Sequence, residues 1–364
     1  MIISRTPFRI SFFGGGTDYP TWYRKHGGAV LTSTINKYCY IMCRYLPPFF
    51  EHKFALRYSK IENRHNIDDI EHPAVREVLR YLNFSRGVEI NHDGDVPARS
   101  GMGSSSSFTV GLIHALYALR GQMPSKSQLA QESSFIEQER IKEIVGSQDQ
   151  AAVAYGGLNH IVFHQNEELS VRPLTISRDR ARELNSHLML FYTGIQRTAS
   201  NIAESYTNGF EEKRRQLRIM LDLVDEGISI LGSGQDITGF GDLLHEAWAL
   251  KRDLSPLVSN QDIDGIYEAA MSAGALGGKI TGAGGGGFML LFVPPYKQSV
   301  VKEKLHQLIH VPFRFEFSGS QIIFCDPEED YSAEEIRRDH MPIQMFRELA
   351  IPTIGDSRLF HDEN

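Results

Sequence analysis

The segment that most constrains the fold is a run of glycines and serines leading directly into an apolar helix, DVPARSGMGSSSSFTVGLIHAL. Gly101 and Gly103 can adopt positive φ and let the backbone approach a ligand closely. The serines at 104–107 open a helix that we expect to end at Gly121. Because a helix N-terminus carries roughly half a positive elementary charge and free N–H groups, the segment predicts a phosphate-binding loop. A serine hydroxyl there can also reach a magnesium ion. A flexible serine-rich linker is the alternative, but a helix as apolar as FTVGLIHALYAL would not follow it at once.

A second glycine-rich segment is AMSAGALGGKITGAGGGGFMLLF. Gly282, Gly284 and Gly287 satisfy the G-x-G-x-x-G pattern of dinucleotide-binding folds literally. That fingerprint lies between a strand and a following helix, whereas here a helix precedes and a strand follows, which argues against hydride transfer. It is not a P-loop either, because Ile280 stands where a serine or threonine is required. What remains is a glycine loop able to lie close to phosphates with Lys279 nearby, or else a plain glycine-rich hairpin.

Polar side chains gather in two more segments. In RISFFGGGTDY, Arg9 lies on an expected strand and Asp18 follows a glycine turn. In SSFIEQERIKEIVGSQDQ, Asp149 lies past an expected helix end, with Glu137 and Glu139 upstream. One carboxylate to orient an alcohol and another to hold a metal is what phosphoryl transfer requires. The plainer alternatives stay open: Asp18 can cap its turn, and the other carboxylates can be solvated charges.

The length of 364 residues predicts two domains. Both halves mix helix and strand patterns, which indicates an α+β class with a break near residue 190. We expect strands over 1–13, 29–46, 87–94, 156–164, 187–194, 284–294 and 312–319. We expect helices over 72–84, 104–121, 125–146, 199–231, 241–254, 263–274 and 300–309. The polar segment after Asp326 has helical patches that the pattern does not place.

Charge and composition exclude several classes of protein. The formal net charge of −7 argues against a broad nucleic-acid or anionic-membrane surface. Cys39, Cys43 and Cys325 cannot build a disulfide framework, and a zinc site would lack its second ligand pair. The three cysteines are better interpreted as reduced thiols than as disulfides or zinc ligands. There is no apolar run that would span a bilayer and no signal-type cleavage site, so we expect a cytoplasmic location.

Taken together, these segments resemble the GHMP kinase superfamily, which includes galactokinase, homoserine kinase and mevalonate kinase. The family's phosphate loop P-x-x-x-G-L-G-S-S-A-A is similar to PARSGMGSSSS at 97–107, with Met for Leu and two serines for alanines. The C-terminal glycine motif is similar to residues 279–287. The sugar-kinase motif, an arginine followed by G-E-H-T-D-Y, is similar to Arg9 and GGGTDY at 14–19. Glycines replace its Glu-His pair, so any role of that pair is lost or moved.

The resemblance implies a two-domain GHMP kinase fold: a ribosomal-protein-S5-like ATP-binding domain over 1–190, a ferredoxin-like domain over 191–330 and a tail over 331–364. FGGGTDYP and the G-x-Q-D-Q turn are most similar to the D-glycero-D-manno-heptose 7-phosphate kinases. This implies transfer of the γ-phosphoryl group of ATP to the anomeric hydroxyl, giving the 1,7-bisphosphate. Alternatives are a galactose- or fucose-type kinase, a decarboxylase of the same fold, and a non-catalytic sensor. Asp18 lies in a motif similar to that of the sugar kinases, which argues against the decarboxylase.

The resemblance also implies roles for individual residues. Asp149 would be the catalytic base and Arg9 its cationic partner, while Ser105 and Glu137, with Glu139 second, would hold magnesium. The triphosphate would contact Gly101, Met102, Gly103, Ser104, Ser105, Ser106, Ser107, Gly284 and Gly285. The sugar phosphate would contact Gly16, Thr17, Asp18, Lys279 and Arg197, the last chosen over Arg44, Arg57 and Arg99 for the existing phosphate. The expected cofactors are ATP and Mg²⁺, and the expected partner is a small-molecule sugar phosphate. We expect no nucleic acid and no membrane, and a homodimer stays open.

Overall fold

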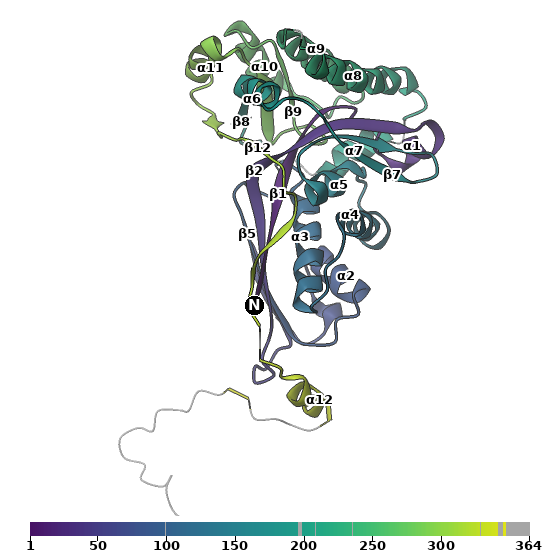
Figure 1. Ribbon diagram of the computed structural model, residues 1–364, viewed down its shortest axis with the longest axis vertical. Helices are drawn as coiled ribbons and strands as arrows, with labels where there is room; N and C mark the ends of the chain where they lie inside the picture. The colour runs from purple at the N-terminus through teal and green to yellow at the C-terminus, as the bar shows by residue number, and fades with distance from the viewer. Residues whose placement is uncertain are drawn as a thin grey trace, which may run out of the picture.

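The computed structural model describes residues 1–98, 100–195, 199–207, 209–234, 236–327, 329–340 and 345–346. Its strands form a larger sheet in the lower part of an elongated molecule and a smaller sheet at the upper end (Figure 1). Helices accompany both sheets, as the α+β prediction requires. In the part of the chain described, no helix is both long and apolar enough to cross a bilayer.

The larger sheet is built around two long neighbouring strands, β1 (Ile2–Phe13) and β2 (Gly28–Tyr45). Its path runs β13-β1-β2-β5-β3-β4, while β6 and β12 pair with β2, and β7 pairs with β6. The pairing is antiparallel except between β3 and β5. The other strands are β3 (Phe54–Arg57), β4 (Ile61–Arg64), β5 (Val88–Gly94), β6 (Leu158–Phe163), β7 (Leu169–Pro173), β12 (Phe315–Glu316) and β13 (Gln321–Cys325).

The smaller sheet is antiparallel and follows the order β11-β8-β10-β9. Its strands are β8 (Leu188–Tyr192), β9 (Gly277–Ile280), β10 (Phe288–Phe292) and β11 (Ile309–His310). The residues of β10 are all buried, which accounts for the continuous apolar run FMLLF in the sequence. Helices pack around this sheet at the upper end of the molecule (Figure 1).

The helices fall into two groups. Those beside the larger sheet are α1 (Pro20–His26), α2 (Pro73–Tyr81), α3 (Ser104–Leu119), α4 (Lys126–Phe135) and α5 (Gln148–Tyr155). Those that follow are α6 (Arg178–His187), α7 (Ala199–Thr207), α8 (Arg214–Gly232), α9 (Thr238–Arg252), α10 (Gln261–Ser272), α11 (Gln298–Lys304) and α12 (Ser332–His340). Short 3₁₀ turns lie at Ile67–Asp69 and Pro295–Lys297.

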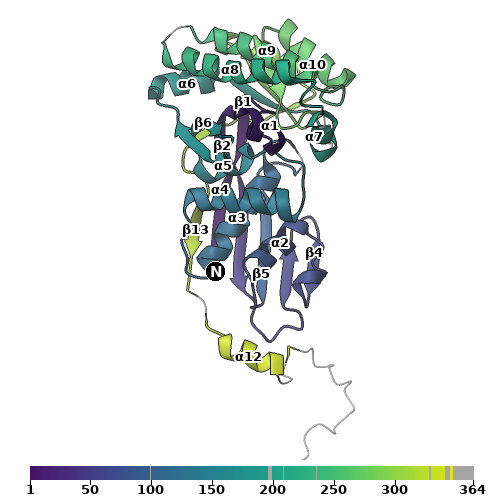
Figure 2. The same ribbon diagram turned by 90° about the vertical axis from the view of Figure 1, so that its right-hand side faces the viewer.

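Helix α3 is the central helix of the N-terminal half. It packs against β1 and β2 on one side and against α2, α4 and α5 on the others, and Figure 2 shows α2, α3 and α4 stacked on one face of the sheet. Since it is covered on several sides, it can be apolar around its circumference, and it is buried almost continuously from Ser106 to Leu116. The predicted end at Gly121 is confirmed by that residue's φ of +70°.

The helix predicted over 125–146 is wrong in its second half. Ser125 caps α4 by accepting a hydrogen bond from the Gln128 N–H, but α4 ends at Phe135. A π-helical turn follows over Ile136–Arg140, and the chain is then irregular up to Ser147. The end of this irregular stretch packs against the N-terminal turn, where Gly146 lies so close to Asp18 that a Cβ there would be 1.8 Å from Oδ2. Asp149 therefore lies in the first turn of α5 rather than in a polar turn.

The proposed division into 1–190 and 191–330 differs in detail from the sheet memberships. The strand β8 begins at Leu188 and belongs to the smaller sheet, whereas β12 and β13 return to the larger one. In particular, Ile2 and Ile3 of β1 pair with Cys325 and Phe324 of β13. The boundary near 190 remains our proposal, with residues 315–325 contributing strands to the N-terminal half.

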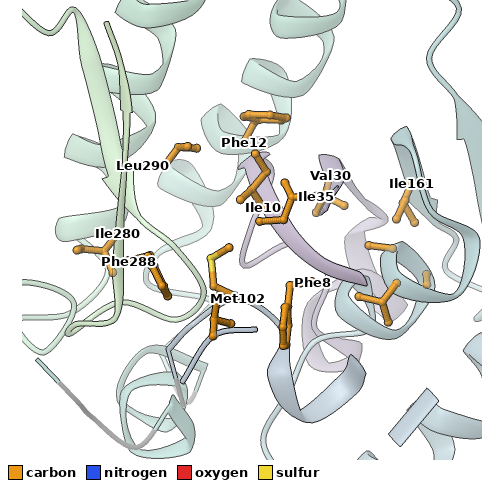
Figure 3. Close-up of a cluster of buried hydrophobic side chains, with 14 of the residues drawn as sticks. Phe8, Ile10, Phe12, Val30, Ile35, Met102, Ile161, Ile280, Phe288 and Leu290 are labelled. Carbon is orange, nitrogen blue, oxygen red and sulfur yellow. The ribbon is translucent and has the colours of Figure 1, made fainter. Parts of the chain in front are cut away.

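Apolar side chains join the two sheets. Figure 3 shows the side chain of Met102 between Phe8 and Ile10 of β1 and Ile280 and Phe288 of the smaller sheet. Met102 is 0% exposed and belongs to the continuous core. The predicted phosphate loop is therefore fixed by a side chain buried where the two halves meet.

Candidate active site

A cavity of about 370 Å³ opens where the two halves of the molecule meet. Its size lies within the range of small-molecule sites. From the N-terminal half it is lined by Arg9, Ser11, Gly15, Gly16, Asp18, Tyr19, Gly101, Gly103, Ser104, Ser105, Ser106, residues 143–146, Gln148 and Asp149. From the C-terminal half it is lined by Ala203, Tyr206, Lys251, Leu254, Lys279, Gly282 and Ala283. The sequence segments singled out above therefore meet in one place.

Arg9 and Asp149, which both line this cavity, form a two-pronged ion pair. Nε and Nη2 of Arg9 donate to Oδ1 and Oδ2 of Asp149, both at 2.6 Å. The third nitrogen, Nη1, donates to the carbonyl oxygen of Gly101 at 2.8 Å. The Arg9 side chain is 4% exposed and that of Asp149 is 23% exposed. This geometry fixes the orientation of the carboxylate and leaves one side of it open to a ligand.

Asp18 is the second carboxylate of the cavity. Its Oδ1 accepts the Gly16 N–H at 2.9 Å and its Oδ2 accepts Nε2 of Gln148 at 2.9 Å. Within the described residues it forms no ion pair. Burial raises the pKa of Asp18 to about 6, helped by the nearby charge of Asp149, while the bond from Gly16 lowers it. A carboxylate held by neutral donors keeps free lone pairs, which suits it to sugar hydroxyl groups.

The phosphate loop reaches the cavity through its backbone and its first serines. Gly101 and Gly103 have φ of +76° and +75°, and a Cβ on Gly101 would lie 2.6 Å from the Thr281 carbonyl oxygen. Ser104, Ser105 and Ser106 line the cavity at the first turn of α3. N–H groups of a first helical turn lack intrahelical acceptors. This end of α3 is therefore built to bind an anion.

Two members of the predicted loop turn their side chains away from the cavity. Met102 lies in the core, and its backbone carbonyl accepts the Arg9 N–H at 3.0 Å. Ser107 is 0% exposed and donates its hydroxyl to the Pro7 carbonyl at 2.9 Å. The geometry does not support the predicted ligand contacts of these two side chains, which instead fasten the loop to β1.

Of the C-terminal glycine motif, the first residues line the cavity and the middle ones do not. Gly282 and Ala283 line the cavity. Gly285 donates its N–H to the Val258 carbonyl at 2.8 Å, and a Cβ on Gly284 would lie 2.9 Å from the same oxygen. The predicted ligand contacts of Gly284 and Gly285 are therefore not supported, because this stretch packs against the loop after α9.

Glu137 lies in the π-helical turn and is 0% exposed. Its Oε2 accepts hydrogen bonds from Ser106 Oγ, at 3.0 Å, and from Gln150. Its Oε1, equally buried, has no hydrogen-bond partner among the described residues. Burial raises the pKa of Glu137 to about 7. A buried carboxylate with an unused oxygen fits a cation site, and π-turns occur often at functional sites.

Magnesium usually binds one or two carboxylates together with phosphates. In the described chain no group of three or more His, Cys, Asp or Glu side chains could hold a metal alone. Glu137 and the exposed Ser105 would therefore supply only part of a coordination shell. Glu137 does not line the cavity itself, and it contacts Ser106, the neighbour of the predicted Ser105.

The remaining predicted sugar contacts are divided. Gly16 and Lys279 line the cavity. The Thr17 hydroxyl donates to the Gly14 carbonyl at 2.8 Å and lies 3.0 Å from the Ala29 carbonyl, so its predicted contact is not supported. Arg197 lies outside the described residues.

The arginines that were weighed beside Arg197 give no alternative. Arg99 also lies outside the described residues. Arg44 and Arg57 both donate to Glu89 across the sheet, and neither lines the cavity.

Several groups in the cavity were missed by sequence reasoning, and a tyrosine pair and a lysine stand out among them. Tyr19 and Tyr206 place their hydroxyls 3.2 Å apart at the wall, and burial raises the pKa of both well above the usual range. Lys251 enters from the last turn of α9 and is 6% exposed. A signal for Lys251 did exist, because it continues the apolar stripe of Leu244, Ala247 and Trp248 at helical spacing.

A helix N-terminus that shares a cavity with an arginine-held carboxylate is the arrangement that phosphoryl transfer to a small molecule requires. The GHMP kinases N terminal domain model matches residues 70–157, and the GHMP kinases C terminal model matches residues 220–310. The chain is 30% identical over 310 residues to the D-glycero-alpha-D-manno-heptose 7-phosphate kinase of Campylobacter jejuni, covering 82% of this chain and 91% of that one. The chain belongs to the GHMP kinases and is a carbohydrate kinase.

Other relatives agree with this family. The galactokinase of Thermococcus kodakarensis is 26% identical, over 79% of this chain and 88% of that one. Among solved structures, a D-glycero-D-manno-heptose 1-phosphate kinase from Bacteroides thetaiotaomicron superposes with a TM-score of 0.73 at 23% identity, covering 90% of this chain and 100% of that one. At that identity the likeness bears on the fold alone.

Proposed function

We propose that this sugar kinase uses ATP and Mg²⁺ to phosphorylate the anomeric hydroxyl of a sugar phosphate. The substrate we favour is D-glycero-D-manno-heptose 7-phosphate, which would give the 1,7-bisphosphate. The observation that carries the proposal is the Arg9–Asp149 pair, set between the serine end of α3 and the sugar-type Asp18. The name of the Campylobacter relative, 30% identical, supports the choice of sugar.

Each residue has a task that follows from its surroundings. Asp149 would accept the proton of the attacking hydroxyl on its open side. Arg9 would hold Asp149 in place and offset charge that develops on the transferred group. The first turn of α3 and the glycines at 101 and 103 would hold the nucleotide's phosphates. Magnesium, held by Glu137 and a serine hydroxyl, would neutralise phosphate charge when bound.

Positioning carries most of this chemistry, because the transition state of phosphoryl transfer is loose and needs little covalent help. General-base catalysis supplies about 10²–10⁴-fold. We therefore expect Asp149→Asn to lower kcat within that span while the fold persists. Loss of the phosphate loop should be the more harmful change.

The test is ATP consumption with a panel of hexoses, heptoses and their phosphates, followed by ³¹P NMR of the product. We expect turnover to be greatest with heptose 7-phosphate and a new phosphate on C1. Asp179→Asn serves as control, since the Asp179 side chain is 91% exposed at the start of α6. Turnover of galactose or fucose in place of heptose phosphate would refute the choice of substrate, and normal turnover by Asp149→Asn would refute the choice of base.

A further inference from the structure

Two lysines from the C-terminal half reach into the cavity, and among the described residues only backbone carbonyls accept hydrogen bonds from their ammonium groups. Lys251 Nζ donates to the carbonyl of Gly282 and lies 3.5 Å from that of Ile280. Lys279 Nζ donates to the Phe12 carbonyl at 2.8 Å. Throughout the described ranges, neither lysine forms an ion pair with a carboxylate. Both are nevertheless buried, at 6% and 3% exposure.

Two like charges buried together are unfavourable unless an anion offsets them. Burial, and next to it the charge of Arg9, lower the pKa of Lys251 to about 7. Burial also lowers the pKa of Lys279 well below its usual value, with Lys251 the next cause. An ammonium group has three N–H donors, and Lys279 uses one of them in its hydrogen bond to the Phe12 carbonyl. The pair therefore has unused N–H donors at the cavity wall, and a bound anion would favour the charged form of both lysines.

Ser11 gives a second and independent indication of a ligand at this wall. Its hydroxyl is buried, has no hydrogen-bond partner among the described residues, and belongs to a side chain that lines the same cavity. Ser11 precedes Phe12, whose carbonyl holds Lys279. It also lies two residues along β1 from Arg9, and such residues share one face of a strand. A hydroxyl and two ammonium groups thus converge from β1, α9 and β9.

We propose that Lys251, Lys279 and Ser11 bind the phosphate group that the sugar substrate already carries. The inference rests on the proposed function and gives it a specificity site. Two observations favour this occupant over the nucleotide. The helix end of α3 already provides a separate anion site, and both lysines interact electrostatically with Asp18. The described arginines that were weighed for this role are paired with Glu89, so they do not compete for it.

The test compares Lys251→Met and Ser11→Ala with the unaltered chain, using heptose 7-phosphate and the same heptose without phosphate. Charge-assisted hydrogen bonds of this kind correspond to about 10- to 100-fold in affinity. We expect the KM for heptose 7-phosphate to rise by about that factor in Lys251→Met and by less in Ser11→Ala. The preference for the phosphorylated over the unphosphorylated sugar should shrink in parallel, and Lys251→Arg should restore part of it.

Lys126→Met is the matched control, because Lys126 also donates to two backbone carbonyls, those of Tyr155 and Ser318, but outside the cavity. It should leave the KM for heptose 7-phosphate unchanged. An equal fall in kcat for both sugars in Lys251→Met would place the lysines on the transferred phosphoryl group and overturn the inference.

Calorimetric binding of heptose 7-phosphate separates this inference from the proposed function. We expect Lys251→Met to weaken binding by the same factor without any turnover being needed. Unchanged binding would overturn the inference even if the chain is a heptose kinase. Absent turnover of every sugar by the unaltered chain, together with phosphate-dependent binding lost in Lys251→Met, would refute the proposed reaction and leave the anion site standing.

Discussion

Asp18→Asn should make the protein more stable and less active. Asp18 is 1% exposed, and its pKa is raised from 3.8 to about 6. A difference of about two pKa units corresponds to about 3 kcal/mol of unfavourable free energy once the carboxyl is ionised. The new amide can still accept the Gly16 N–H, and Gln148 can turn to offer its Oε1, which has no partner among the described residues.

The sign of the pH dependence makes this prediction specific. Because the folded-state pKa lies above the unfolded value, the contribution of Asp18 to stability is complete below pH 4 and is lost as the pH rises through 6. Urea unfolding of the unaltered chain and of Asp18→Asn should therefore give similar free energies near pH 4. At pH 7 the variant should be more stable by about 3 kcal/mol, while its kcat/KM for the sugar falls.

The control for this comparison is Asp179→Asn, whose side chain is exposed and whose effect on stability should be small at both pH values. Equal stability of Asp18→Asn and the unaltered chain at pH 7 would refute the reasoning. So would a difference that does not grow between pH 4 and pH 7, since buried ionisation is its only stated cause.

Two further changes test the loop and the cation site. Gly101→Ala should raise the KM for ATP at least about tenfold. At a φ of +76° the new Cβ would meet the Thr281 carbonyl, and the backbone strain would be about 1–2 kcal/mol. Gly121→Ala is the control: its φ is +70°, a Cβ there would have no atom within 4 Å, and the KM for ATP should stay unchanged. Glu137→Gln should raise the Mg²⁺ concentration for half-maximal turnover about tenfold, as loss of a ligating carboxylate implies. In the unaltered chain the Mg²⁺ concentration for half-maximal turnover should increase as the pH falls below 7, because protons compete with the metal for Glu137. A Mg²⁺ requirement that does not change with pH, or one that is unchanged in Glu137→Gln, would contradict the role of Glu137 as a metal ligand.

The sequence predicts the parts of this molecule that depend on local chemistry. The start of α3 follows from glycines that precede a serine run, and the convergence of Arg9, Asp18 and Asp149 follows from motifs in family order. Lys251 was missed because a lysine on a helix is normally a solvated charge, and only its place in an apolar stripe distinguishes it. The irregular stretch before Asp149 ends in contact with Asp18, which lies 128 positions before Gly146 in the chain, and no local pattern contains such a contact. The π-turn at Glu137 has no signal in the local pattern either.

The edges of the larger sheet escaped prediction for a similar reason. Gln321–Cys325 is short and partly exposed, so its periodicity is weak. Its strand character comes from pairing with Ile2–Arg5 at the other end of the chain. Such pairing is a property of topology rather than of composition.

The same pairing has a consequence for biosynthesis. Residues 2–5 are translated some three hundred codons before the segment that covers their outer edge, 321–325. At ordinary elongation rates this leaves the edge uncovered for tens of seconds. A nascent chain stalled or cut before that segment would carry an open strand able to pair with another nascent chain.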